Sequence, residues 1–167
     1  FQFSSIVFIK IPASVKYIGY HAFYFCHNLQ SIEFMEESNI LIFDNFIERS
    51  PINKINIPSS LIEIKDTWCS NLKNLVCITI SPLNNNFLYF NNDFILQKSF
   101  INSFNFDVLV FSRRNVQNVT IPSFVKRINM NAFHQCSKIR NIEFSNDSKL
   151  YYIGENAFCE SSIKQIK

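Results

Sequence analysis

Glycine is almost absent from this chain: its 167 residues include two, Gly19 and Gly154. A phosphate-binding loop needs several glycines close together so that backbone amides can surround the anion. The sequence therefore excludes a nucleotide site of that kind. It also lacks a run of about 20 apolar residues, the length that spans a bilayer as a helix, and it shows no signal-peptide pattern.

A strong charge of either sign is also lacking. The 16 Lys and Arg residues nearly balance the 13 Asp and Glu residues, for a net charge of +3. These charges are scattered rather than clustered, and nucleic-acid binding needs a basic stripe or patch. The carboxylates show no spacing suited to paired acid and base catalysis. The chain is therefore not expected to bind nucleic acid or to be an enzyme.

Cysteine pairs with metal-binding spacing are missing as well. None of the five cysteines forms a C-x-x-C pair, and their odd number leaves at least one outside any disulfide. This composition indicates neither a zinc knuckle nor a full disulfide framework. The five are Cys26, Cys69, Cys77, Cys136 and Cys159.

What the chain does contain is an internal repeat. Ile121–Phe144 matches Ile11–Phe34 at Ile-Pro, at the following Val and Ile, at Ala-Phe, at Cys, and at the closing Ile-Glu-Phe. The interval from the first Ile to the last Phe is the same in both segments and defines the period. A fixed period of about 20–29 residues with aliphatic residues at constant offsets is typical of leucine-rich repeats.

The full pattern, I-P-x-S-V-x-x-I-G-x-x-A-F-x-x-C-x-x-L-x-x-I-x-F, resembles the BspA-type leucine-rich repeats. These occur in surface proteins of parasitic protozoa, trichomonads especially, and of some host-associated bacteria. The resemblance implies a leucine-rich repeat solenoid of α/β class dominated by β-structure. It also implies a role in adhesion to host cells or matrix, as a surface antigen.

Each repeat is expected to form one coil of a right-handed solenoid. The alternation of apolar and polar residues predicts parallel strands centred on Lys10, Glu33, Asn56, Thr79, Thr120 and Glu143. A second extended piece is expected at Val15–Ile18, Leu61–Ile64, Val125–Ile128 and Leu150–Ile153. Gly19 and Gly154 then favour a left-handed corner.

A short helical turn is expected to start at each Ala-Phe. Its aromatic residues would stack inside the solenoid as a ladder of Phe23, Phe46, Phe133 and Phe158. In one coil Trp68-Cys69 replaces this pair, and exchanging a large and a small neighbour keeps the core volume filled.

The array is interrupted once. The interval from Ile80 to Ile121 exceeds one period by most of a second one. Residues 81–113 are therefore predicted to be an insertion within a single domain of residues 1–167. Phe87–Phe90 and Phe94–Gln97 would form a β-hairpin around three residues that favour tight turns, followed by a strand at Val108–Phe111. The aromatic residues of the next loop either cover the hairpin or form a contact surface: Phe100, Phe104 and Phe106.

Two histidine–cysteine groups are candidates for metal or catalytic sites. His21, Cys26 and His27 form one, and His134 with Cys136 forms part of another. The repeat explains both more simply, because Cys26 and Cys136 occupy one repeat position as small buried residues. No base-orienting Asn or Asp recurs with them. We therefore predict no catalytic, cofactor or metal site, while an enzyme or metalloprotein around His21, Cys26 and His27 remains an alternative.

The predicted function, as the resemblance implies, is non-enzymatic protein recognition by a surface or extracellular protein. Two N-glycosylation sequons, at Asn118 and Asn146, are meaningful only if the chain is secreted. An intracellular interaction scaffold is the alternative. The start at Phe1 and the lack of polar capping repeats lead us to expect a fragment of a longer array. The partner would be a protein, such as a host cell-surface or matrix protein, rather than a small molecule. The predicted contacts on the strand face are Glu33, Lys54, Asn56, Asn118 and Glu143.

Overall fold

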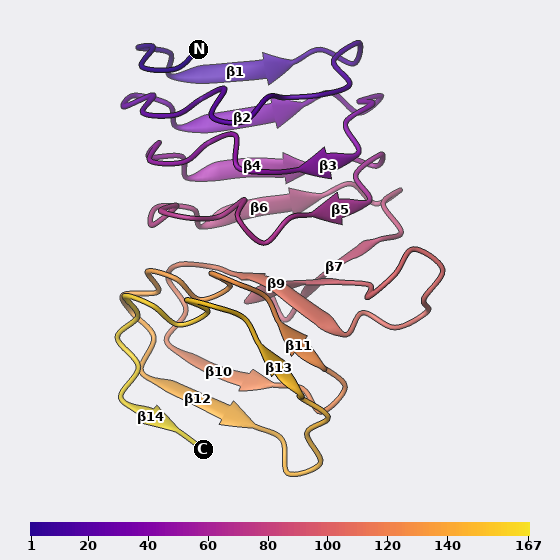
Figure 1. The fold of residues 1–167 in the computed structure, drawn as a ribbon, viewed down its shortest axis with the longest axis vertical. Coiled ribbons are helices and arrows are strands. Elements are labelled where there is room, and N and C mark those ends of the chain that lie inside the picture. Colours follow the sequence, from indigo (N-terminus) through magenta and orange to yellow (C-terminus); the bar gives the residue numbers. More distant parts are fainter. The chain divides into compact units, whose positions relative to one another are not determined.

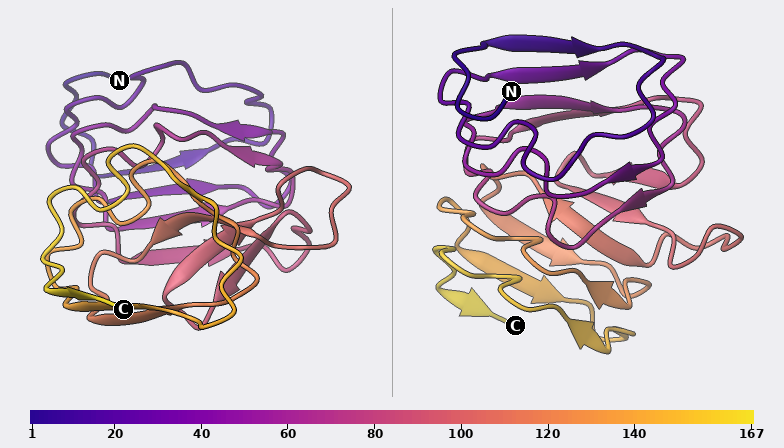
Figure 2. Two further views of the ribbon diagram at one scale, coloured as in Figure 1. Left: turned by 60° about the horizontal axis from the view of Figure 1, so that its bottom comes forward. Right: turned by 45° about the horizontal axis from the view of Figure 1, so that its top comes forward.

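Short parallel strands that recur once per repeat build the chain, and a computed structural model describes all of residues 1–167. The strands belong to two units, Phe1–Asn86 and Phe87–Lys167. Figure 1 draws the first unit in indigo to magenta and the second in salmon to yellow. Each unit carries one sheet of repeat strands and a second sheet on another side of its coils (Figure 2).

The first unit has a four-stranded parallel sheet in the order β1-β2-β4-β6. Its strands are β1 (Phe8–Ile11), β2 (Ser31–Phe34), β4 (Lys54–Ile57) and β6 (Cys77–Ile80). The register places Lys10 beside Glu33 and Asn56 beside Thr79. The apolar residues that flank these polar ones turn inward: Ile32 and Ile55 are 1% and 0% exposed. The predicted strands and their inward faces are confirmed.

A two-stranded parallel sheet lies on another side of the first unit. It pairs β3 (Ile42–Phe43) with β5 (Glu63–Ile64). The extended piece predicted at Val15–Ile18 is not a strand. The step that pairs Ile42 with Glu63 is shorter than the step that pairs Ile32 with Ile55 in the repeat sheet, so the register between coils changes there.

The second unit repeats this plan with an addition. Its repeat strands form a parallel sheet of β10 (Asn118–Ile121), β12 (Asn141–Phe144) and β14 (Gln165–Ile166). The other sheet has the order β13-β11-β9-β8-β7. It contains β7 (Phe87–Phe90), β8 (Phe94–Gln97), β9 (Val108–Ser112), β11 (Arg127–Ile128) and β13 (Tyr152–Ile153).

The hairpin predicted in the interruption is confirmed. Strands β7 and β8 pair antiparallel, with Phe90 opposite Phe94. The turn between them contains Asn91 and Asn92 at φ 51° and 56°, the positive values that a type I′ turn needs and that Asn tolerates. Strand β9 then pairs antiparallel with β8 and parallel with β11. The hairpin is thereby joined to the coil sheet of the second unit.

The short helical turns predicted at Ala-Phe are wrong, because the structure contains no helix. Some backbone N–H groups of this turn donate within the turn, and others donate to the next coil. Ala132 N–H donates within the turn, to Asn129 O at 3.3 Å, whereas Phe133 N–H donates to Ala157 O of the next coil at 2.7 Å. Gln135, at φ 60°, again donates across coils. Donors used between coils cannot form the i to i−4 bonds of a helix, so the solenoid is built from strands and turns.

The left-handed corner predicted at the two glycines is also wrong, since neither has a positive φ. The left-handed residues lie two positions later in the turn. They are His21 (59°), Asn131 (60°) and Asn156 (54°).

The predicted aromatic ladder is present within each unit. Phe23 and Phe46 are 2% and 1% exposed, and their rings meet edge to face at 6.5 Å. Phe133 is fully buried and stacks on the half-buried Phe158 at 5.1 Å. Trp68 and Cys69 are also buried, which agrees with the predicted exchange of volume in their coil. The two cores are therefore aromatic as well as aliphatic.

Candidate functional site

The polar residues of the first repeat sheet surround a hollow of about 350 Å³. Glu33, Lys54 and Asn56 line it, together with Phe8, Ser31, Ile32 and Thr79. Because side chains alternate along a strand, the buried isoleucines force these polar neighbours outward. The three contact residues predicted in this unit therefore lie around one hollow.

A smaller hollow of about 150 Å³ lies on the repeat sheet of the second unit. Its lining includes Asn118, Thr120, Asn141 and Glu143. The Asn141 Nδ2 donates to Asn118 Oδ1 at 2.7 Å, so two successive coils present a connected pair of amides. The remaining two predicted contact residues therefore share this second hollow.

The charges on both faces are mixed and exposed. Lys10 Nζ lies 3.1 Å from Glu33 Oε1, with both side chains about half exposed, and Lys167 Nζ lies 3.9 Å from Glu143 Oε1. Exposed pairs of this kind contribute about 0–1 kcal/mol. Either carboxylate can therefore leave its lysine and pair with a positively charged group of a partner at a small cost in free energy.

Asn56 differs from the other predicted contacts because its amide is used inside the sheet. Its Oδ1 accepts from Phe34 N–H at 2.7 Å, and its Nδ2 donates to Phe34 O at 2.9 Å. The backbone pairing of β2 with β4 covers Ser31–Lys54 and Ile32–Ile55 only. The Asn56 side chain continues this ladder along the strand, a role that its position in the sequence alone does not reveal.

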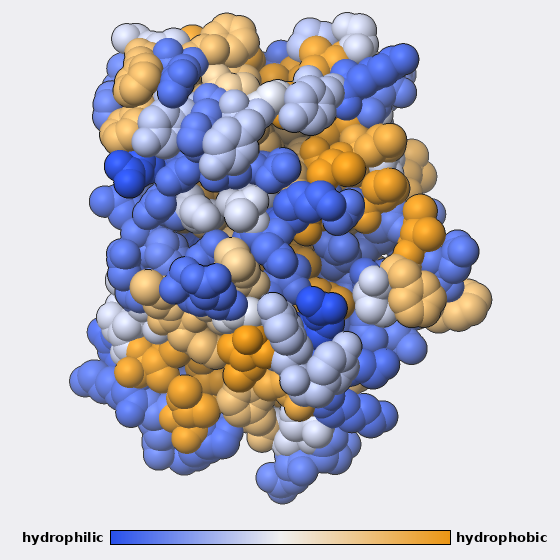
Figure 3. All heavy atoms as spheres, viewed as in Figure 1, coloured by the Kyte–Doolittle hydropathy of each residue, from blue (hydrophilic) through white to orange (hydrophobic).

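The loop between β8 and β9 carries exposed aromatic residues. Phe100 and Phe104 are 66% and 95% exposed, and Ile101 is 61% exposed. Phe106 instead packs partly buried against the core of the second unit. Figure 3 shows apolar side chains gathered where this loop projects in Figure 1. Of the two alternatives for these aromatics, covering the hairpin applies to Phe106, whereas a contact surface at the exposed Phe100 and Phe104 stays a prediction.

The histidine–cysteine group of the first unit is not assembled as a ligand set. His21 Nε2 lies 3.1 Å from Glu48 Oε2, and Cys26 is fully buried with its thiol donating to Phe1 O at 3.0 Å. His27 is exposed. Cys136 is buried as its repeat position predicts, and burial raises the pKa of its thiol above the ordinary value.

The chemistry-bearing cluster of the second unit was missed by the sequence analysis. It combines His134 with Cys159 and Glu160, which follow it by about one period. The signal that could have found it is the length of the last coil, because the step from Arg127 to Tyr152 is longer than the step from Asn118 to Asn141.

The structure contains no helix that is long and apolar enough to span a membrane.

Parallel strand faces, hollows lined by polar residues and turns bonded from coil to coil define a β-solenoid of the leucine-rich repeat class. The family model described as "BspA type Leucine rich repeat region" matches residues 1–110 and 107–167 in six copies. The chain belongs to the BspA-type leucine-rich repeat family. No curated protein matches it significantly.

Solved structures share this fold. A leucine-rich cell surface protein from Faecalibacterium prausnitzii A2-165 is 21% identical, with a TM-score of 0.79 over 96% of this chain and 41% of that chain. The pneumococcal vaccine antigen PcpA is 23% identical, with a TM-score of 0.79 over 100% of this chain and 40% of that chain. A leucine-rich repeat protein from Eubacterium ventriosum ATCC 27560 is 18% identical, with a TM-score of 0.66 over 96% and 56%. The chain spans about two fifths of the first two.

Proposed function

We propose that this chain is a non-enzymatic protein-recognition module of a surface or extracellular protein, acting in adhesion or host interaction. The observation that carries the proposal is the strand face of each unit, where the predicted contact residues line a hollow. Solenoids commonly bind partners along such an extended sheet face. The names of two structural neighbours, a cell surface protein and a vaccine antigen, agree with a surface location.

The partner expected at these faces is a folded protein. The hollow of the first unit has exposed side chains such as Phe8 and Lys54 on its walls, whereas a small-molecule pocket is enclosed and mostly apolar. Both signs of charge occur on each face, so a polyanion such as nucleic acid would meet repulsion. Glu33, Lys54, Asn118 and Glu143 would contact the partner directly.

For Asn56 the proposal assigns a positioning role. Both polar atoms of its amide already bond the Phe34 backbone, so a partner would have to compete with two hydrogen bonds of the sheet. By holding β4 against β2, Asn56 keeps the neighbouring Lys54 and Glu33 in register. The exposed Phe100 and Phe104, in the loop between β8 and β9, would add an aromatic contact of the kind enriched in protein interfaces.

The test uses two double variants, one for each face. Glu33→Ala with Lys54→Ala alters the first face, and Asn118→Ala with Glu143→Ala alters the second. Binding to immobilised basement-membrane extract is measured by biolayer interferometry. We expect each double variant to weaken binding at least about tenfold, a loss of about 1.4 kcal/mol.

The matched control is Glu37→Ala with Lys73→Ala, which removes one exposed charge of each sign away from the strand faces. It should bind like the unaltered chain. Full binding by both face variants would assign the site to the aromatic loop or to other surfaces. No binding by the unaltered chain would remove the adhesion proposal.

An intracellular interaction scaffold is the second candidate, and the odd number of cysteines favours it. Extracellular domains usually carry their cysteines as disulfide pairs, whereas cytosolic thiols stay reduced. Cytosolic extract immobilised in parallel distinguishes the two. Binding to that extract alone, lost in the same face variants, would support the intracellular function.

A further inference from the structure

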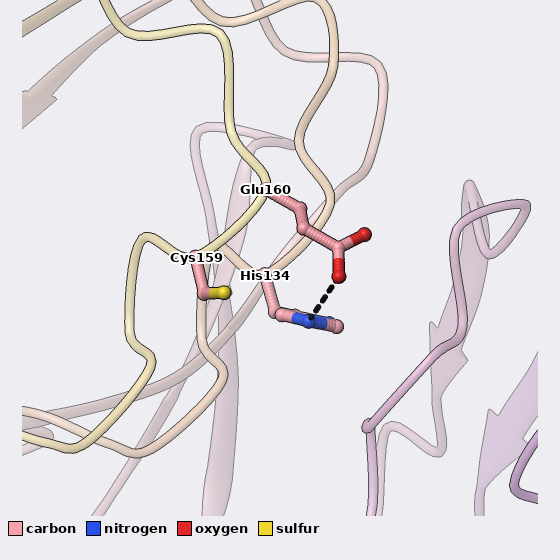
Figure 4. A group of neighbouring side chains, drawn as sticks. All are labelled: His134, Cys159 and Glu160. Carbon is pink, nitrogen blue, oxygen red and sulfur yellow. Dashed lines mark ion pairs between the residues drawn. The ribbon is translucent and has the colours of Figure 1, made fainter.

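Three side chains that bind metals in other proteins converge in the second unit. His134 lies in the turn before β12, and Cys159 and Glu160 lie in the turn after β13. One ligand atom from each lies within 4.8 Å of the others. Figure 4 shows the Cys159 sulfur and the Glu160 carboxylate both turned toward the His134 ring. The three ligands therefore come from two successive coils.

The coil-to-coil hydrogen bonds explain this convergence. Arg127 pairs with Tyr152, and the same step along the chain carries His134 onto Cys159. Phe133 N–H donates to Ala157 O at 2.7 Å, and Gln135 N–H donates to Cys159 O at 2.9 Å. The two bonds flank His134 and hold the backbones of both turns at a constant spacing. Hydrogen bonds between the coils therefore hold in place the backbones that carry the three ligands.

His134 itself is buried with unused bonding capacity. It is 7% exposed, and its Nδ1 is buried without a hydrogen-bond partner. Its Nε2 lies 3.8 Å from Glu160 Oε1, beyond the range of a hydrogen bond. The Nε2 atom faces Glu160, so a neutral imidazole that carries its proton on Nδ1 offers the Nε2 lone pair to a metal.

We propose that His134, Cys159 and Glu160 bind one zinc ion, with water as the fourth ligand. Zinc bonds of about 2.0–2.3 Å to nitrogen, oxygen and sulfur place tetrahedral ligands about 3.3–3.7 Å apart. The His134–Glu160 separation of 3.8 Å is already close to this value. Cys159 and Glu160 are exposed, so rotation of their side chains can close the remaining distance.

The donor set selects the metal. A thiolate with an imidazole favours zinc over magnesium or calcium, which prefer oxygen ligands. On binding, the Cys159 thiol releases its proton to solvent, and thiolate plus carboxylate then neutralise the two positive charges of the ion. Gln135 Nε2 donates to Glu160 Oε2 at 2.9 Å, which leaves Oε1 for the metal and orients the carboxylate as outer ligands of metal sites do.

The bound ion would join two successive coils of the second unit. Any ligand that binds the folded state alone stabilises that state. Zinc should therefore raise the melting temperature of the metal-free chain. This site is separate from the strand faces, so its test does not depend on the proposed function.

The experiment titrates the untagged, reduced and metal-free chain 1–167 with zinc against a chromophoric chelator, and with cobalt as a spectroscopic probe. We expect one equivalent to bind and cobalt to show a thiolate charge-transfer band. Cys159→Ser should abolish that band, and both Cys159→Ser and Glu160→Gln should lower zinc affinity at least tenfold. Zinc should also slow the alkylation of Cys159 and leave that of Cys77 unchanged.

The controls are Cys77→Ser, the other exposed cysteine, and Glu155→Gln, an exposed carboxylate of the same coil. Both should bind zinc like the unaltered chain, and circular dichroism verifies folding. The proposal is overturned if the unaltered chain shows no saturable binding, or if folded Cys159→Ser keeps its affinity. Should Cys159→Ser fail to fold, equal alkylation of Cys159 with and without zinc overturns it.

Discussion

At the scale of single residues, Gly154 shows why a solenoid needs glycine at one coil and tolerates other residues at another. A Cβ built on Gly154 would lie 2.8 Å from Asn129 C and 2.9 Å from Met130 Cα, both backbone atoms of the preceding coil. Gly19 occupies the same repeat position, and its Cβ would meet only Tyr17 Cε1 at 3.9 Å. Close packing between coils, rather than backbone conformation, therefore explains Gly154.

Gly154→Ala should lower the free energy of unfolding by about 1–3 kcal/mol, the usual cost of overpacking. Gly19→Ala is the matched control. Gly19 has space for a Cβ atom and a negative φ that alanine also adopts. The substitution lowers the conformational entropy of the unfolded chain, so it should leave the free energy of unfolding unchanged or raise it by about 0.4–1 kcal/mol. Urea unfolding followed by circular dichroism measures both. Equal effects of the two substitutions would contradict this account of Gly154.

Phe133 tests the aromatic ladder. It is fully buried against Phe158, and Phe133→Ala should cost about 3–5 kcal/mol because a buried aromatic site is emptied. Phe104→Ala removes the same ring from a position that is 95% exposed, and should change stability by less than about 0.5 kcal/mol. Chemical unfolding curves of both variants measure these two changes in stability. An unchanged curve for Phe133→Ala would mean that the ladder does not support the core.

At the scale of elements, the β7–β8 hairpin depends on its turn. Asn92 has φ 56°, a conformation that costs a non-glycine residue about 1–2 kcal/mol and a β-branched residue more. Asn92→Val should therefore destabilise the chain by about 1–2 kcal/mol, whereas Asn92→Gly should keep or improve stability. The measurement is chemical unfolding of the two variants side by side. Identical midpoints would argue against a type I′ turn in solution.

The repeat turn is the other informative element. Its amide groups divide their hydrogen bonds between their own coil and the next one, as Ala132 and Phe133 show. A turn of this kind is stabilised only when a neighbouring coil supplies acceptors. Helix propensity at Ala-Phe is therefore outweighed by pairing between coils, which also sets His134 beside Cys159.

At the scale of the whole molecule, burial divides the thiols into two groups. Cys77 and Cys159 are exposed, whereas Cys26, Cys69 and Cys136 are buried. Thiolate is the reactive form, and burial raises the pKa of Cys136. In the metal-free folded chain we expect a thiol reagent to modify Cys77 and Cys159 quickly, and all five cysteines after denaturation. Mass spectrometry of the alkylated peptides identifies them, and rapid modification of Cys26 or Cys136 would show that the cores are open.

The sequence by itself determined the repeat period, the strands on the repeat sheets, the hairpin and the buried aromatic positions. These features follow from patterns within one coil: Ile55 and Ile57 alternate with outward polar residues, and Asn91-Asn92 favours a tight turn. Their physical cause is local, because side-chain alternation and turn conformations are set by neighbours along the chain.

Only the tertiary structure decided how each coil bonds to the next. In place of the expected helical turns, hydrogen bonds such as Phe133 N–H to Ala157 O join the coils. Gly154 packs against the backbone of the preceding coil. The side-chain amide of Asn56 forms two hydrogen bonds with the backbone of Phe34. The tertiary structure also brought His134 to Cys159 through the longer step that pairs β11 with β13. A backbone donor or side chain at one position can bond within its coil or across to another, and the choice depends on the register between coils.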